Sequence, residues 1–118
     1  MSATLYGLTK CSTCQKAIKW LQKQGVAHQF IDYREHPLSP AQLKDWAAQR
    51  GGFDQLINRS GPTWRNLSPM RQSPGTEAEW LLLIREYPAL VRRPVNVLAD
   101  GSVSVGFSDK HYTSLFPR

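Results

Sequence analysis

The sequence lacks any long hydrophobic run. The aliphatic run Leu81–Ile84 is far shorter than the roughly 18 residues that a transmembrane helix needs, so we predict no membrane span. The first four residues contain no basic segment followed by an apolar stretch, so we predict no signal peptide and expect a cytoplasmic location. With only two cysteines in 118 residues, a disulfide-stabilised scaffold is also excluded.

Acidic residues are few as well: 9 Asp and Glu stand against 15 Lys and Arg, which gives a net charge of +6. Such an excess of positive charge is typical of proteins that bind nucleic acid, an acidic partner or a small anion. The basic residues are spread from Lys10 to Arg118 and form no long block, so nucleic acid is not the favoured partner. The proportions of hydrophobic (41%) and charged (20%) residues are those of an ordinary globular domain.

Apolar periodicity in the first third of the chain predicts a β-α-β unit. Residues 4–8 and about 28–32 are predicted strands, and residues 15–24 are a predicted helix that ends at Gly25. Such a unit is typical of a small α/β domain.

The rest of the chain is predicted to be helical first and then to form a hairpin. Ser39, Pro40 and Gln42 form a capping box that begins a helix ending at Gly51-Gly52. A short helical stretch is predicted at 54–57, mostly loop at 58–74, and a helix from a second capping box at 76–79 to Pro88. Strands at 95–98 and 103–107 flank an Asp-Gly turn, and a short helix follows at 109–115.

A C-x-x-C motif lies between the first predicted strand and the helix after it. Cys11 stands just ahead of that helix, and Cys14 is one turn further on. Unpaired N–H groups at a helix N-terminus stabilise a thiolate, and Lys10 adds positive charge nearby. Thiol chemistry would use Cys11 as the exposed nucleophile and Cys14 as the resolving thiol.

Two other roles remain open for this cysteine pair. A zinc site normally has four ligands, but the chain has no second C-x-x-C and its three histidines are scattered, so we predict no metal. The pair could also be two buried structural cysteines. A C-x-x-C in a β-α-β context without a signal peptide favours a thioredoxin-like redox motif.

Two longer motifs near opposite ends of the chain resemble those of the arsenate reductase (ArsC)/Spx family. They are residues 5–17, around the cysteine pair, and residues 90–95, which read LVRRPV. Residues 106–109 resemble the Spx and YffB-like branch, and residues 59–65, with Thr63-Trp64-Arg65, are similar to YffB-like members. The resemblance covers essentially the whole chain.

This resemblance implies an α/β, thioredoxin-like (glutaredoxin-like) fold. We expect a single domain over residues 1–118, in which a helical insertion at about 39–87 separates the β-α-β and β-β-α halves. The resemblance also implies a cis peptide bond before Pro94, next to the active site and to bound glutathione.

The resemblance assigns roles to individual residues. In the family's arsenate reductases one cysteine attacks the oxyanion, and Cys11 matches that position. Family arginines that hold the oxyanion match Arg59 and Arg93, and Arg92 resembles the Spx branch. A forked guanidinium suits an anionic substrate or a glutathione carboxylate. Without the resemblance, Arg92 and Arg93 would be interpreted as solvated surface residues. A third family arginine matches Gly106 here, and that departure argues against arsenate as the substrate.

We therefore predict a glutathione-dependent thiol-disulfide reductase of the arsenate reductase-like family, acting on a disulfide or a small anionic substrate. The predicted catalytic residues are Cys11, Cys14, Arg59 and Arg93; Arg59, Arg92, Arg93 and Pro94 are predicted to bind glutathione. Glutaredoxin is a possible further partner. The alternative is an Spx-like redox-sensing transcriptional regulator that binds RNA polymerase, and a third interpretation is a binding domain without catalysis.

Overall fold

The computed structural model describes residues 2–117, which divide into two compact units. Among these residues, the first unit comprises 2–36 and 93–117, and the second comprises Pro37–Arg92. The second unit thus interrupts the first in sequence. None of the helices in the described part of the chain is long and apolar enough to cross a bilayer.

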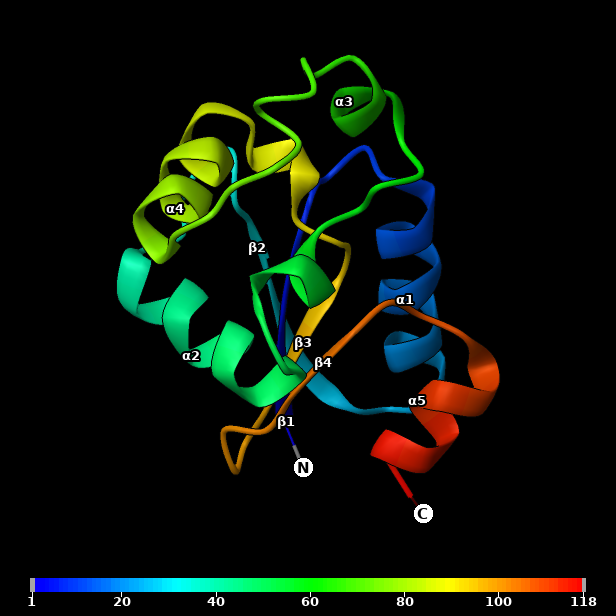
Figure 1. The fold of residues 1–118 in the computed structure, drawn as a ribbon. Helices are drawn as coiled ribbons and strands as arrows, with labels where there is room; N and C mark the ends of the chain where they lie inside the picture. Colours follow the sequence, from blue (N-terminus) through cyan, green and yellow to red (C-terminus); the bar gives the residue numbers. More distant parts are fainter. Residues whose placement is uncertain (1, 118) are drawn as a thin grey trace. The chain divides into compact units, whose positions relative to one another are not determined.

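The first unit is a four-stranded sheet with two helices (Figure 1). Its elements are β1 (Ser2–Gly7), α1 (Ser12–Lys23), β2 (Ala27–Asp32), β3 (Val95–Leu98), β4 (Val103–Val105) and α5 (Asp109–Leu115). The strand order is β2-β1-β3-β4, in which β1 runs parallel to β2 and antiparallel to β3, and β3 runs antiparallel to β4. The predicted α/β, thioredoxin-like class is confirmed.

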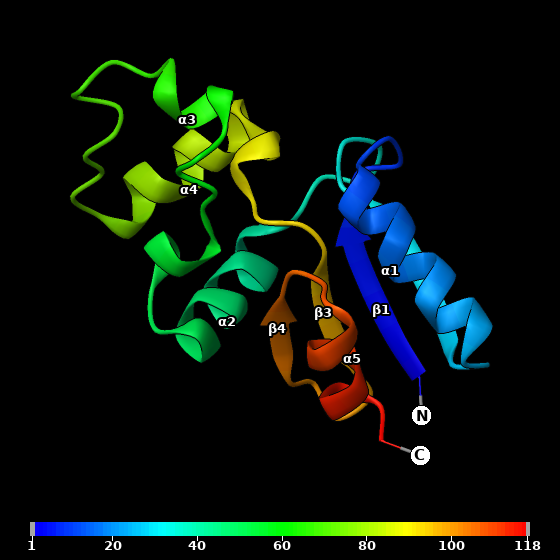
Figure 2. The ribbon, with the colours of Figure 1, turned by 90° about the vertical axis from the view of Figure 1, so that its right-hand side faces the viewer.

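One hydrophobic cluster holds β1, α1 and α5 together. Its buried members come from these three elements and from the residue after α5: Ala3, Leu5, Ala17, Leu21, Tyr112 and Phe116. Trp20 of α1 packs edge-on against Tyr112, with ring centroids 5.4 Å apart. Because both helices share one cluster with β1, they cover the same face of the sheet, and Figure 2 shows α1 running alongside β1. This packing holds α1, whose first turn carries Cys14, against β1.

The second unit is built of helices. They are α2 (Pro40–Arg50), the 3₁₀ helix η1 (Phe53–Leu56), α3 (Pro62–Arg65), α4 (Glu77–Glu86) and the 3₁₀ helix η2 (Pro88–Leu90). At the start of α2 the Ser39–Gln42 capping box has both of its hydrogen bonds, as predicted. At the start of α4 only half of the predicted box forms, because the Glu79 carboxylate accepts a hydrogen bond from the backbone N–H of Gly75 and from the Thr76 hydroxyl.

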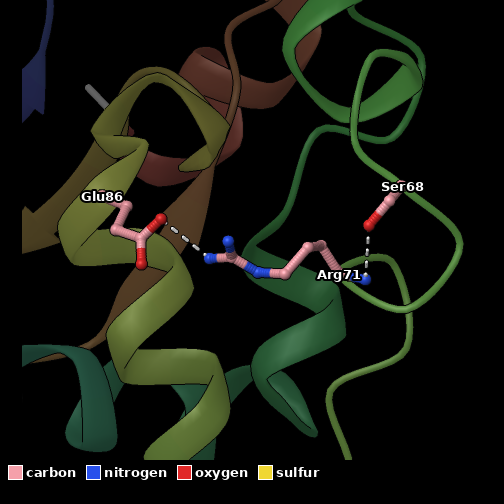
Figure 3. Close-up of polar contacts among 3 residues, drawn as sticks. All are labelled: Ser68, Arg71 and Glu86. Carbon is pink, nitrogen blue, oxygen red and sulfur yellow. Dashed lines mark hydrogen bonds and ion pairs between the residues drawn. The ribbon is translucent and has the colours of Figure 1, made fainter.

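The segment that we predicted to be mostly loop, residues 58–74, contains the short helix α3. Pro62 begins it, and the Trp64 ring stacks on Trp80 of α4 with centroids 6.4 Å apart. Further along, the Arg71 guanidinium donates to the Glu86 carboxylate at 2.9 Å, and its backbone N–H donates to the Ser68 hydroxyl (Figure 3). Tertiary contacts therefore order a stretch whose polar, proline-rich sequence predicts irregular structure.

An isolated antiparallel bridge between Ile57 and Val91 joins distant parts of the second unit. The backbone N–H of Asn58 donates to the carbonyl of Leu90 at 2.8 Å, and that of Arg92 donates to the carbonyl of Leu56 at 2.7 Å. These bonds pair the segment after η1 with the segment after η2.

Candidate active site

The two cysteines have different environments at the start of α1. Cys11 is the N-cap residue, with extended backbone angles, and its carbonyl accepts the first helical hydrogen bond from Gln15 at 3.0 Å. Its side chain is half-buried, whereas Cys14 is fully buried. Cys11 is thus the accessible thiol, in agreement with the sequence-based assignment of the two positions.

Hydrogen bonds from the end of β2 hold the loop that leads to Cys11. One carboxylate oxygen of Asp32 accepts from both the backbone N–H and the hydroxyl of Thr9, at 2.9 and 2.7 Å. The other accepts from the backbone N–H of Arg34 at 2.8 Å. The hydroxyl bond from Thr9 and then its backbone bond are the main causes that lower the pKa of Asp32 to about 2. Asp32 is therefore ionised at neutral pH, and the loop stays tied to β2.

Gly7, the last residue of β1, lies against the buried thiol. A Cβ at this position would overlap the sulfur of Cys14 and would come within 3.3 Å of the Phe30 ring. Gly7 is itself buried. The absence of a side chain here makes the space that Cys14 occupies.

Arg93 lies beside the cysteines within the same unit, and Pro94 follows it in the chain. The Arg93–Pro94 peptide bond is cis, as the resemblance implies, and Pro94 is fully buried. The half-buried Arg93 donates from Nη1 to the hydroxyl of Tyr33 at 3.3 Å and also hydrogen-bonds to the sulfur of Cys11. The structure thus brings together three of the predicted site residues, Cys11, Cys14 and Arg93, and Pro94 directly follows Arg93.

This environment separates the acidities of the two thiols. For Cys11, burial raises the pKa, but hydrogen bonds from the backbone N–H groups of Cys14 and Thr13 and from the Arg93 and Cys14 side chains outweigh it, so the pKa is lowered. For Cys14, burial raises the pKa to about 12. One thiol is prepared to ionise and the other stays protonated.

We expect the alkylation rate of Cys11 to rise with pH around a midpoint below the free-cysteine value of about 8.5. The reason is that hydrogen bonds at the helix N-terminus and from Arg93 favour its thiolate. Mass spectrometry of the peptide that carries Cys11, after timed reaction with iodoacetamide, measures this rate at each pH. A midpoint at or above the free value would contradict the expectation.

Two further predicted residues, Arg59 and Arg92, belong to the second unit. Arg59 is exposed, pairs with the Asp54 carboxylate at 3.6 Å and lies 5.7 Å from the centre of the Trp64 ring. The Arg92 side chain is exposed, and its backbone N–H bonds to the carbonyl of Leu56. Their roles in anion binding stay predictions.

Gly106, where a third family arginine is expected, has φ +87°, a backbone conformation that disfavours side chains. Its N–H donates to the carbonyl of Pro94 at 2.8 Å, and its carbonyl accepts from the side chain of Asn96 at 3.0 Å. An arginine here would be strained even though the space around a Cβ is open.

Sequence reasoning missed three residues that shape this site: Gly7, Asp32 and Tyr33. A signal for them existed, because β1 and β2 are parallel neighbours and their C-terminal ends meet at one edge of the sheet. Residues just after β2 therefore lie beside the loop before Cys11. Among residues 2–117, no group of three or more His, Cys, Asp or Glu side chains could hold a metal ion.

Comparison with known proteins places these residues in a family context. Uncharacterized protein YusI of Bacillus subtilis is 34% identical over 116 residues, which cover 95% of this chain and 96% of YusI. Global transcriptional regulator Spx 1 of Bacillus cereus is 24% identical, over 98% of this chain and 87% of Spx 1.

Two solved structures are similar over nearly the whole chain. A YffB protein has a TM-score of 0.84 and 33% identity, over 95% of this chain and 96% of its own. An arsenate reductase from Vibrio cholerae has a TM-score of 0.81 and 24% identity, over 98% of both chains, which is a likeness of fold.

The ArsC family model matches residues 6–115, from within β1 to the last residue of α5. This match includes the cysteine pair, Arg93 and cis-Pro94, and the chain belongs to the ArsC family.

Proposed function

We propose that this protein is a glutathione-dependent thiol-disulfide reductase in which Cys11 is the nucleophile. The observation that carries the proposal is the asymmetry of the thiol pair. Cys11 is accessible, with a lowered pKa beside Arg93, whereas Cys14 is buried, with its pKa raised to about 12. Reactive cysteines occupy partly exposed, electropositive environments of this kind, and buried structural cysteines do not.

The reaction has two thiol-disulfide exchange steps. The Cys11 thiolate attacks the glutathione sulfur of a mixed disulfide, forms a Cys11–glutathione disulfide and releases the substrate as a thiolate that takes a proton from solvent. The thiolate of a second glutathione then attacks the glutathione sulfur of that adduct, which yields oxidised glutathione and restores the Cys11 thiolate. Overall, one mixed disulfide and one glutathione give one free thiol and one glutathione disulfide.

Arginines supply the anion recognition in this proposal. Arg93, next to Cys11, and Arg59, which the resemblance aligns with a family anion ligand, would bind the carboxylates of glutathione. Arg92 and cis-Pro94 would border the same tripeptide. Because a bidentate guanidinium matches a carboxylate in shape and charge, glutathione is a suitable ligand for such groups. We propose a cytoplasmic location, where glutathione is kept reduced, and glutaredoxin as a second means of reducing the adduct.

Side-by-side assays with a glutathione mixed disulfide and with arsenate test this function. We expect turnover of the mixed disulfide and weak or absent turnover of arsenate, because Gly106 leaves one arginine fewer to replace the water around a compact oxyanion. Formation of oxidised glutathione, followed by coupled oxidation of NADPH, measures both. Strong arsenate reduction without mixed-disulfide turnover would refute the proposal.

A second candidate is a redox-sensing regulator that binds RNA polymerase. It is favoured by the similarity to Global transcriptional regulator Spx 1, which extends over 98% of this chain. In that case the Cys11–Cys14 pair would act as a switch between dithiol and disulfide. Tight binding to purified RNA polymerase, with no thiol turnover on any disulfide, would select this function.

A further inference from the structure

We propose that Tyr33 is a positioning residue that holds the Arg93 guanidinium toward the sulfur of Cys11. The proposal rests on the proposed function in taking Cys11 as the nucleophile. It adds a residue that the cysteine motif and the arginine motif do not contain, and it gives a reason why a buried tyrosine hydroxyl lies in this site.

Tyr33 is itself firmly held. It directly follows β2, and its backbone N–H donates to the carbonyl of Gly7 at 3.0 Å, which extends the pairing of β1 and β2 by one residue. Its side chain is only 1% exposed, so its hydroxyl has a fixed place. The preceding residue, Asp32, ties down the loop that leads to Cys11. Consecutive residues at one strand end thus support the two partners, the thiol and the arginine.

Arg93 needs such support because its side chain is long and flexible. Nη1 donates to the Tyr33 hydroxyl at 3.3 Å, and the guanidinium also bonds to the Cys11 sulfur. A guanidinium has five N–H donors in a rigid fork, so it can engage both groups at once. Fixing one side of the fork on Tyr33 orients the other side toward the thiolate.

A tyrosine hydroxyl anchors the guanidinium without neutralising it. A carboxylate in the same place would form an ion pair with Arg93 and compete with the thiolate for its charge. Burial raises the pKa of Tyr33 to about 12, which outweighs the opposing effect of Arg93, so the phenol stays neutral. The positive charge of Arg93 therefore remains available to Cys11.

The titratable groups around the Cys11 thiol do not complicate this assignment. Cys14 and Tyr33, whose pKa values are both raised to about 12, stay protonated at neutral pH. Arg93 stays charged, and Lys10 precedes Cys11 on the exposed loop. A change in the pH dependence of Cys11 alkylation therefore reports on the thiol itself.

The test compares Cys11 alkylation against pH in Tyr33→Phe and Tyr112→Phe. We expect Tyr33→Phe to raise the pH midpoint of Cys11 alkylation. At pH values below this midpoint, the substitution should slow alkylation about two- to tenfold, the range expected for a weakened hydrogen bond to a charged group. Tyr112 is an equally buried tyrosine, but its hydroxyl donates to Asn96, so Tyr112→Phe should leave the midpoint unchanged. A thiolate also becomes less nucleophilic as its pKa falls, so the alkylation rate at one pH would mix two effects. The pH midpoint of alkylation is therefore the quantity to compare.

Arg93 variants show whether Tyr33 acts through the guanidinium. In an Arg93→Ala background, Tyr33→Phe should not raise the pH midpoint of Cys11 alkylation any further. Such a result is the signature of coupled residues in a double-mutant cycle. Arg93→Lys keeps the charge but has no fork to hold both partners, so it should also raise the midpoint. This variant leaves Tyr33 intact and tests the same geometry if Tyr33→Phe proves unstable by circular dichroism.

Three results would overturn the proposal: an unchanged midpoint in folded Tyr33→Phe, an unchanged midpoint in Arg93→Lys, or a full Tyr33→Phe effect in the absence of Arg93. None of these measurements uses glutathione or a substrate. A failure of the mixed-disulfide assay would therefore refute the proposed reductase function while leaving the positioning of Arg93 to be judged by alkylation alone.

Discussion

Replacing Cys11 by serine is expected to lower the turnover of a glutathione mixed disulfide at least about a thousandfold. The reason is that a serine hydroxyl stays protonated at neutral pH and cannot form the disulfide intermediate. Cys11 is the accessible thiol of the pair and the one whose pKa is lowered, so no second group is ready to take over. Initial rates of glutathione disulfide formation measure the loss.

The matched control for this substitution is Cys14→Ala. Cys14 is buried, and its raised pKa keeps it protonated, so its removal should leave turnover within about tenfold of the unmodified protein. The second glutathione then resolves the adduct from outside. If Cys14→Ala loses as much activity as Cys11→Ser, Cys14 is a required resolving thiol and the two-glutathione scheme is wrong.

Replacing Gly7 by alanine is expected to lower the free energy of unfolding by about 1–3 kcal/mol, the usual cost of overpacking a well-packed interior. The added methyl group would overlap the Cys14 sulfur and press on the Phe30 ring. Both neighbours lie in the same unit as Gly7, so neither can move away without disturbing the packing of α1 or β2 on β1. Urea denaturation followed by circular dichroism measures the change from the shift in midpoint.

Two controls distinguish this overlap from a general intolerance of alanine. Removing the sulfur should relieve most of the strain, so Gly7→Ala should cost much less in a Cys14→Ala background than in the unmodified protein. Gly75→Ala adds the same methyl group where its nearest neighbour is a flexible Glu79 oxygen 3.9 Å away, and it should change stability by less than about 0.5 kcal/mol. An equal cost of Gly7→Ala in both backgrounds would show that Cys14 is not the cause.

Local signals in the sequence predicted most of the first unit and the start of α2. The Asp100-Gly101 pair predicted the turn between β3 and β4, where the Asp100 carboxylate accepts from the backbone N–H of Ser102 at 2.9 Å. Ser39, Pro40 and Gln42 predicted the start of α2 because a capping box is complete within four consecutive residues. Such signals depend on neighbours in the chain, and no tertiary contact is needed to recognise them.

Contacts between distant residues could not be predicted in this way. The bond from Arg93 to Tyr33 joins residues 60 positions apart, and nothing local to either shows that they meet. The helix α3 was predicted as loop, and the stacking of Trp64 on Trp80 that accompanies it involves a separate helix. Composition alone would place Arg93 in solvent, whereas the fold buries half of it beside Cys11.

The left-handed backbone at Gly106 also has a consequence for how this family can diversify. A glycine codon becomes an arginine codon by one base change, so mutation offers that arginine often. Each such variant must hold an L-residue at φ +87°, at a cost of roughly 1–2 kcal/mol, before its guanidinium contributes anything. An arginine just after β4 would therefore have its full effect only together with a second change that relaxes this backbone, so two mutational steps are favoured over one.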